Sequence, residues 1–310
     1  MSRHPAAAAA LAAVAMLAAS CTTNPGGGTS APTQTVTVTL PPPPSSGAPV
    51  ITPTEQPTDV LPSETATVLV TPTPEPTKTE IDVVAPAPAE DLVANRQQVF
   101  CPKGTHEGCH TYEDMETYLT HILALVSPMF DQLYGSANRP SHFYYIATGQ
   151  VGTTACPAPG NTLAPYDSSS YLYCGIDQAI YTGQDSLWLY YAGLGDAAPA
   201  VAYAHEWGHH IQNIMEVPRP RTPQEQVPRE NQADCIAGAW VNYAHKSGYL
   251  EYPTDLGDIS RLMQTIASAE SNIYRTHGTL EERVYALQYG YYYGLPGCNQ
   301  YFPNTPIFNG

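Results

Sequence analysis

The decapeptide YAHEWGHHIQ, residues 203–212, places three histidines and a glutamate within six positions. His205, Glu206 and His209 form the pattern His-Glu-x-x-His, and the residues around it favour a helix. Because residues four apart share one helix face, the two imidazoles can reach one metal ion. Glu206 lies about 100° around the helix from His205, where it can hold a water on that ion without binding the ion itself. The pattern therefore favours a catalytic metal site over a polar surface helix or a packed core histidine.

The third histidine, His210, is expected to have a different role. It follows His209 by one residue, so its side chain points about 100° away and cannot share the same ion. We interpret His210 as a residue that packs or hydrogen-bonds behind the site.

A catalytic zinc needs three protein ligands and an open fourth position. One known solution, a third histidine in His-Glu-x-x-His-x-x-Gly-x-x-His, is excluded because Gln212 and Met215 occupy its last two defined positions. The other solution is a glutamate on a following helix, with an aspartate one turn later. The segment RENQADC, residues 229–235, offers Glu230 as the ligand and Asp234 to orient an imidazole. The apolar run CIAGAWV that follows indicates a buried helix.

Four ordered motifs resemble those of the bacterial putative neutral zinc metallopeptidase family. They are YCGIDQAIY, HEWGHHIQ, ENQADCIAGAW and THGTLEERV, and the resemblance covers most of residues 140–310. It implies a zincin-like fold that binds one Zn²⁺ through His205, His209 and Glu230. It also implies Glu206 as the general base and a peptide or protein as the substrate. An additional segment, VPRPRTPQEQVP, departs from the simpler family pattern between the two metal-binding helices.

The predicted chemistry is hydrolysis of a peptide bond. Zinc lowers the pKa of its bound water towards about 7, and Glu206 can take the proton and pass it to the leaving amine. A donor for the developing oxyanion is also needed. His277, in the loop THGT, is one candidate, and one of the 22 tyrosines is the other. The run YLYCGIDQAIYTG is expected to offer a strand edge to an extended peptide.

Helices around a small sheet are predicted to position these residues. Helical spacing and capping residues predict helices at 111–134, 196–215, 228–247 and 258–274, and one that starts at Thr279. Short aromatic and β-branched runs predict strands at 142–148 and 171–183. The fold class is therefore α+β.

The N-terminal third is predicted to lie outside this fold. Residues 1–20 resemble a lipoprotein signal peptide, with Cys21 as the lipidated residue, although an ordinary signal with an incidental cysteine is the alternative. Residues 21–93 hold no aromatic residue and are rich in proline and threonine, which predicts a disordered stalk. Residues 94–310 then form the zinc metallopeptidase domain, outside the cytoplasmic membrane in the bacterial cell envelope.

Six further cysteines predict a disulfide-bonded domain. Proximity in the sequence suggests Cys101 with Cys109 and Cys156 with Cys174, which leaves Cys235 with Cys298. The chain has no Cys-x-x-Cys pair, which argues against a cysteine-ligated zinc. From residue 94 onward, 20 acidic residues oppose 10 basic ones, so nucleic acid is not an expected partner.

The sequence thus predicts a membrane-tethered zinc peptidase. A zinc amidase acting on peptidoglycan peptides and a non-catalytic, zinc-containing binding lipoprotein are the two alternatives. The presence of Glu206 argues against the second, because a structural zinc site does not need a general base.

Overall fold

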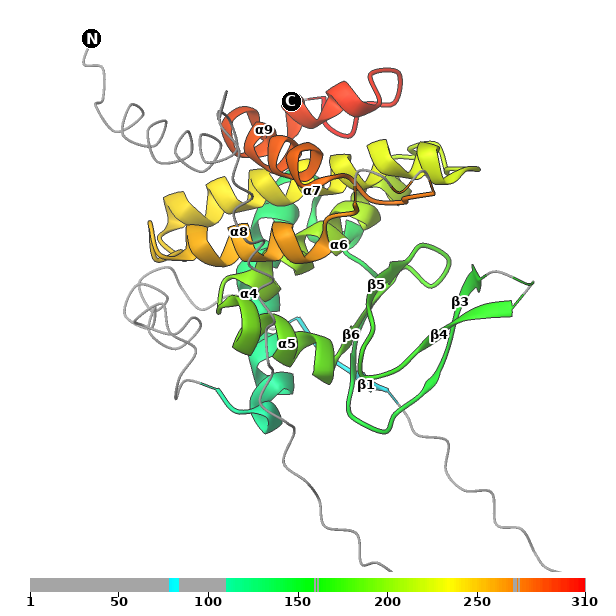
Figure 1. Ribbon diagram of the computed structural model, residues 1–310, viewed down its shortest axis with the longest axis vertical. Helices are drawn as coiled ribbons and strands as arrows, with labels where there is room; N and C mark the ends of the chain where they lie inside the picture. Colours follow the sequence, from blue (N-terminus) through cyan, green and yellow to red (C-terminus); the bar gives the residue numbers. More distant parts are fainter. Residues whose placement is uncertain are drawn as a thin grey trace, which may run out of the picture. The chain divides into compact units, whose positions relative to one another are not determined.

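A computed structural model describes residues 78–83, 110–158, 160, 162–269, 272 and 274–309. The predicted signal peptide, Cys21, most of the predicted stalk and the predicted Cys101–Cys109 pair lie outside these residues. Within them, several helices pack with a four-stranded sheet and a two-stranded hairpin (Figure 1). The predicted α+β class is confirmed. None of the described helices is both long and apolar enough to span a membrane.

The four-stranded sheet has the order β1-β2-β6-β5. Strands β2 (His142–Ile146) and β6 (Ala179–Gly183) run parallel at its centre, and β5 (Tyr171–Cys174) pairs antiparallel with β6 and forms one edge. The predicted strand at 171–183 is in fact two strands, because the chain reverses at residues 175–178, where Gln178 adopts a positive φ of 51°. The reversal places β5 at the edge of the sheet.

The other edge strand, β1 (Thr79–Glu80), comes from the range predicted to be stalk. It pairs antiparallel with β2, and Ile81 beside it is buried. The Lys78 ammonium lies 4.1 Å from the centre of the Tyr144 ring, a cation–π contact. The stalk prediction therefore extended too far, because the short run KTEIDV carries one apolar anchor and one cation that the sheet can bind.

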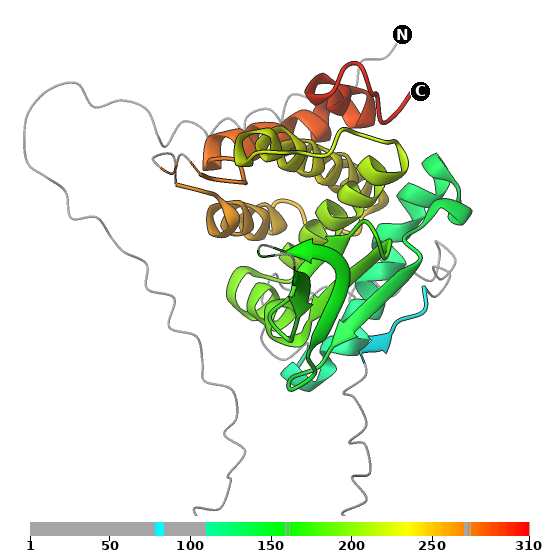
Figure 2. The same cartoon turned by 90° about the vertical axis from the view of Figure 1, so that its right-hand side faces the viewer.

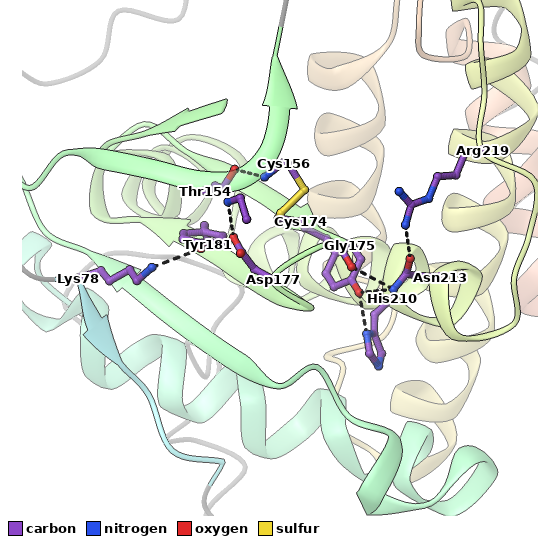
Figure 3. The surroundings of a disulfide bond; sticks show 12 residues. Lys78, Thr154, Cys156, Cys174, Gly175, Asp177, Tyr181, His210, Asn213 and Arg219 are labelled. Carbon is purple, nitrogen blue, oxygen red and sulfur yellow. Dashed lines mark hydrogen bonds between the residues drawn. A yellow bond between two sulfur atoms is a disulfide. The ribbon is translucent and has the colours of Figure 1, made fainter. Parts of the chain in front are cut away.

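A hairpin of β3 (Gly152–Ala158) and β4 (Thr162–Tyr166) was not predicted. Both strands contain a proline, Pro157 and Pro165, which weakens the sequence signal for a strand. The predicted disulfide between Cys156 and Cys174 is present and joins this hairpin to β5 (Figure 3).

Six α-helices are described, and their bounds refine the predictions. They are α4 (Met115–Tyr134), α5 (Gln184–Leu194), α6 (Ala198–Ile214), α7 (Pro223–Ser247), α8 (Asp255–Ile266) and α9 (Leu280–Cys298). Helix α5 was not predicted, and α8 ends well before residue 274. Helix α7 begins earlier than predicted because the Thr222 hydroxyl accepts a hydrogen bond from the Glu225 backbone N–H, with Pro223 in the first turn. The Thr279–Glu282 capping box of α9 is as predicted.

Helix α6 lies between the sheet and the pair α7 and α9 (Figures 1 and 2). Its Trp207 stacks on Phe130 of α4, with ring centres 5.1 Å apart, and contacts Phe143 of β2. Helices α7 and α9 approach closely at Gly238 and Gly290, where an added Cβ would lie within 2 Å of a backbone carbonyl oxygen of the other helix. The predicted disulfide between Cys235 and Cys298 joins the same two helices. The helix that carries His205 and His209 therefore has rigid support on both sides.

Candidate active site

Three side chains from α6 and α7 converge on one point. His205 and His209 lie one turn apart on α6, and Glu230 reaches them from α7. One ligand atom of each residue lies within 4.8 Å of the other two. The Nε2 atom of His205 is 3.3 Å from Oε2 of Glu230, and the Nε2 atom of His209 is 3.4 Å from Oε1.

This donor set fits a zinc ion. Ligands held about 2.0–2.1 Å from a tetrahedral zinc lie roughly 3.3 Å from one another, which matches the two nitrogen-to-oxygen distances. Two imidazoles and one carboxylate are also the donor types of a catalytic site that keeps its fourth position open. Of the predicted residues, the structure brings His205, His209 and Glu230 into one cluster.

Asp234 and Arg283 fix the first imidazole. The Asp234 carboxylate oxygen Oδ1 accepts hydrogen bonds from Nδ1 of His205 and from Nη2 of Arg283, both at 2.8 Å. Because a carboxylate only accepts, Nδ1 of His205 carries a hydrogen, and Nε2 is the ring atom that faces Glu230. Burial alone would lower the pKa of His205, but the carboxylates of Asp234 and Glu230 outweigh burial and raise that pKa to about 10. The pocket therefore favours positive charge at this point.

Two glutamines fix the other members of the cluster. Nδ1 of His209 lies 2.9 Å from Oε1 of Gln212, whose amide nitrogen donates to the backbone carbonyl of Arg229 on α7. Gln226 donates to Oε1 of Glu230. The two imidazoles hold the pKa of Glu230 well below its usual range despite its burial, so this side chain is a carboxylate, as a metal ligand must be.

Glu206 lies on α6 at the wall of a cavity of about 290 Å³. Burial raises the pKa of its carboxylate, and the nearby backbone N–H of Tyr173 on β5 opposes that rise. The cavity is lined by helix α6, by aromatic side chains and by residues from the region before and within α9: Tyr171, Tyr190, Ala202, His205, Glu206, Ile266, His277 and Arg283. The predicted general base Glu206 and the predicted ligand His205 thus face the same cavity.

His277 also reaches the cavity. Its Nε2 atom lies 3.4 Å from Oε2 of Glu230, its Nδ1 atom lies 3.0 Å from the Thr276 hydroxyl, and 46% of its side chain is exposed. The metal-compatible cluster does not include it. Of the tyrosines in the cavity wall, Tyr171 donates its hydroxyl hydrogen to the backbone carbonyl of Pro199. Tyr190 is therefore the cavity tyrosine that joins His277 as a candidate donor to substrate.

His210 lies near Gly175, which follows β5 (Figure 3), and its hydrogen bonds go to residues outside the cluster. Its Nε2 atom lies 2.9 Å from the backbone carbonyl of Asn138, and its Nδ1 atom lies 3.0 Å from the Tyr173 hydroxyl. Asn213, on the same helix, donates to the backbone carbonyl of Gly175. His210 thus ties α6 to the sheet, in agreement with its predicted packing role.

Comparison with known protein families identifies a match that covers this site. The family model described as putative neutral zinc metallopeptidase matches residues 91–300. The chain belongs to this family. The matched residues include the three cluster residues, the residues that line the cavity, and both His205 and Arg283, which hydrogen-bond to Asp234.

Curated relatives of this family member are named as uncharacterized proteins. The uncharacterized protein Rv2575 of Mycobacterium tuberculosis H37Rv is 30% identical over 180 residues, which cover 49% of this chain and 59% of that protein. The uncharacterized protein YpfJ of Escherichia coli K12 is 28% identical over 172 residues, which cover 48% and 58%. The matched part thus spans somewhat more than half the length of these relatives. No solved structure matches the chain.

Sequence reasoning missed three residues that support this metallopeptidase site. Gln212 follows His209 by three positions on the same helix, which is a signal that could have been read. Arg283 was quoted within THGTLEERV but given no role, and only the packing of α9 on α7 brings it to Asp234. Gln226 lies in the inserted segment, so that segment supports the site through Glu230.

Proposed function

We propose that this protein is a zinc-dependent peptidase. The observation that carries the proposal is the convergence of His205, His209 and Glu230 at one point, with Glu206 beside them on the wall of the same cavity. A structural zinc site would need no carboxylate in the position of Glu206.

His205, His209 and Glu230 would hold the zinc ion, which when bound would lower the pKa of a coordinated water towards about 7 and polarise the substrate carbonyl. Glu206 accepts the proton from the attacking water, and its raised pKa suits transfer of that proton to the leaving amine. Asp234 and Gln212 hold the imidazoles in place, and His277 donates to the developing oxyanion.

The substrate would be an extended peptide that pairs with β5. Strand β5 forms the edge of the sheet beside α6, with β6 on its other side. The effect of the Tyr173 backbone N–H on the pKa of Glu206 supports placing the outer edge of β5 beside the site. A peptide added as a further strand there would run past Glu206 and the cluster.

The enzyme is also proposed to act outside the cytoplasmic membrane, anchored through a lipidated Cys21. The two disulfides support an oxidising compartment. Growth with a fatty-acid analogue should label the wild-type chain and leave Cys21→Ala unlabelled. Equal labelling of both chains would remove the anchor from the proposal.

The matched pair of wild type and Glu206→Gln tests the enzymatic proposal. Both proteins are loaded with zinc, their zinc content is measured, and hydrolysis of a broad peptide library is followed by mass spectrometry. We expect one zinc per chain in both proteins, with cleavage confined to the wild type. Equal cleavage by a zinc-loaded Glu206→Gln protein would contradict the proposed mechanism, and zinc binding without any cleavage by the wild type would favour a binding protein.

A further inference from the structure

A second cluster of side chains lies at the start of α6, apart from the zinc ligands. Asp196 precedes α6, while Asp255 and Asp258 lie in the first turn of α8. One carboxylate oxygen of each lies within 4.8 Å of the other two, and each residue is only 1% exposed. This depth distinguishes the three residues, hereafter the aspartate cluster, from the acidic groups common on protein surfaces.

Within the aspartate cluster, Asp255 has one buried carboxylate oxygen with no hydrogen-bond partner among the described residues. Oδ2 of Asp258 accepts from the Ala197 backbone N–H at 3.2 Å, and its Oδ1 accepts from Arg261. Oδ2 of Asp255 accepts from the Glu251 backbone N–H at 2.7 Å. Oδ1 of Asp255 is buried and has no hydrogen-bond partner in the described part of the chain. Because Oδ2 is bound to the backbone, Oδ1 is the oxygen that Asp255 can offer to the cluster.

The charge of the aspartate cluster calls for a cation. Burying a carboxylate is costly unless it is paired or binds a metal, and three buried carboxylates within 4.8 Å also repel one another. Arg261 contributes one positive charge, from a side chain that is 51% exposed. A cation held by all three carboxylates would offset their mutual repulsion directly.

The local backbone is shaped around this cluster. Gly195 has a φ of 119°, and a Cβ built there would lie 2.1 Å from the carboxylate carbon of Asp258. The chain between α5 and α6 can therefore pass directly over the Asp258 carboxylate only because residue 195 has no side chain. The Tyr118 hydroxyl of α4 also donates to the backbone carbonyl of Asp196. Elements α4, α6 and α8 thus all meet at this point.

We propose that Asp196, Asp255 and Asp258 bind a calcium ion. Carboxylate oxygens are hard ligands and suit Ca²⁺, which accepts irregular geometry and can be largely dehydrated. Mg²⁺ demands octahedral geometry and usually retains several waters, which a site this deeply buried disfavours. Zinc prefers the imidazole-containing cluster in the middle of α6. The bound calcium would fix the start of α6 against α8, and so brace the helix that carries His205 and His209.

Calcium binding to the full-length, zinc-loaded protein tests this proposal without reference to peptide cleavage. The protein is freed of calcium, kept in excess zinc, and titrated with CaCl₂ or MgCl₂ while bound metal and thermal unfolding are measured. We expect one Ca²⁺ per chain, and an increase in Tm of about 5 °C or more when calcium exceeds its Kd a hundredfold. Magnesium should produce a much smaller shift.

Asp255→Asn and Asp82→Asn form the matched pair of variants. Asp82 is an exposed acidic residue on the segment of β1, so its substitution removes the same charge without touching the cluster. We expect Asp255→Asn to weaken calcium binding at least tenfold and to abolish the Tm increase, and Asp82→Asn to behave as the wild type. Absence of calcium binding by the wild type, or equal binding by Asp255→Asn, would overturn the proposal.

A luminescence measurement on the wild type covers the case in which Asp255→Asn fails to fold. Tb³⁺ substitutes for Ca²⁺ at oxygen sites, and Tyr118, which contacts Asp196, can sensitise its emission. We expect Tb³⁺ emission that calcium displaces and equimolar magnesium does not. Emission that calcium leaves unchanged would contradict a calcium site. Burial raises the pKa of Asp255 to about 7, so the alternative to a metal ion is a proton shared between the carboxylates. In that case calcium would not displace Tb³⁺ emission, and Asp255→Asn would be more stable than the wild type.

Discussion

Helix α6 connects two groups of residues that could each hold a metal ion and that differ in depth and donor type. In its middle, two imidazoles and a carboxylate converge beside a cavity of about 290 Å³. Just before its first residue, three carboxylates meet in a pocket where each residue is 1% exposed. The first cluster adjoins a cavity, as the proposed catalytic zinc site requires, and the second is buried, as suits the proposed structural calcium site.

The difference lies in how the second helix meets α6. Helix α7 presents Glu230 at the level of the two histidines and contributes Asp234 from behind, so its side chains hold one side of the cluster and leave the cavity side open. Helix α8 meets the beginning of α6, where Gly195 lets the backbone close over Asp258. The proposed roles of these acidic residues, catalysis in one cluster and stability in the other, therefore depend on what the packing leaves accessible.

Replacing the third ligand should have the largest effect. Glu230→Ala removes the carboxylate from the cluster, so zinc affinity should fall beyond the roughly 10–100-fold loss typical of outer-shell changes, and peptide cleavage should be lost with it. His210→Ala is the control on the same helix and should retain zinc. Zinc content by mass spectrometry checks both variants. The calcium-dependent Tm increase should survive in Glu230→Ala, and its loss together with zinc would mean that the two clusters are not separate sites.

Removing His277 distinguishes an open zinc site from a closed one. If His277 only donates to the oxyanion, His277→Ala should lower kcat by about 10²–10³-fold and leave zinc content and KM nearly unchanged. Tyr190→Phe, measured in parallel, reports on the other donor in the cavity. Zinc loss from His277→Ala would instead make this residue a fourth ligand, and the site a structural one.

The support behind His205 should matter less than the ligands. Asp234→Asn keeps an oxygen for the imidazole but removes the charge that pairs with Arg283, so zinc affinity should fall about 10–100-fold. Asp177→Asn, which alters a carboxylate bound by the Tyr181 hydroxyl far from α7, is the matched control. Competition with a zinc chelator measures both affinities. An unchanged affinity in Asp234→Asn would show that packing alone holds the imidazole.

The smallest predicted effect concerns stability. Gly195→Ala adds a Cβ that cannot coexist with the Asp258 carboxylate, and it should lower the free energy of unfolding by about 1–3 kcal/mol. Gly149→Ala also has a positive φ, of 87°, but its Cβ would meet nothing within 4 Å. The difference in Tm between the two variants measures the cost of the contact with Asp258, because both glycines have a positive φ. Only Gly195→Ala should lose the increase in Tm on calcium binding. Equal Tm and equal calcium response would contradict the description of this corner.

Local patterns predicted the metal cluster because its residues obey helical spacing. His205 and His209 are four residues apart, and so are Glu230 and Asp234. Each pair therefore shares one face of its own helix, which the sequence alone indicates. The capping box at Thr279 was equally local. The disulfides were assigned by proximity in the sequence, and by elimination in the case of Cys235 with Cys298.

What the sequence did not reveal depends on contacts between distant segments. Arg283 reaches Asp234 across 49 residues, and Asp258 reaches the Ala197 backbone across 61. The helix predicted at 196–215 begins instead at Ala198 after the capping position Ala197, and the carboxylate of Asp196 belongs to the aspartate cluster. Prolines within β3 and β4 weaken the sequence signal for that hairpin, and the proline-rich sequence around β1 does the same for that strand. Hydrophobic periodicity and secondary-structure propensity each describe a single helix or strand. They therefore do not predict sites that form where several elements meet.

Anomalous diffraction at the zinc edge, from crystals of the zinc-loaded protein, tests the central claim most directly. We predict one strong peak bound by Nε2 of His205, Nε2 of His209 and the Glu230 carboxylate, with no fourth protein ligand on the cavity side. A peak whose shell also contains His277, or one that lacks Glu230, would contradict a catalytic zinc site built from α6 and α7.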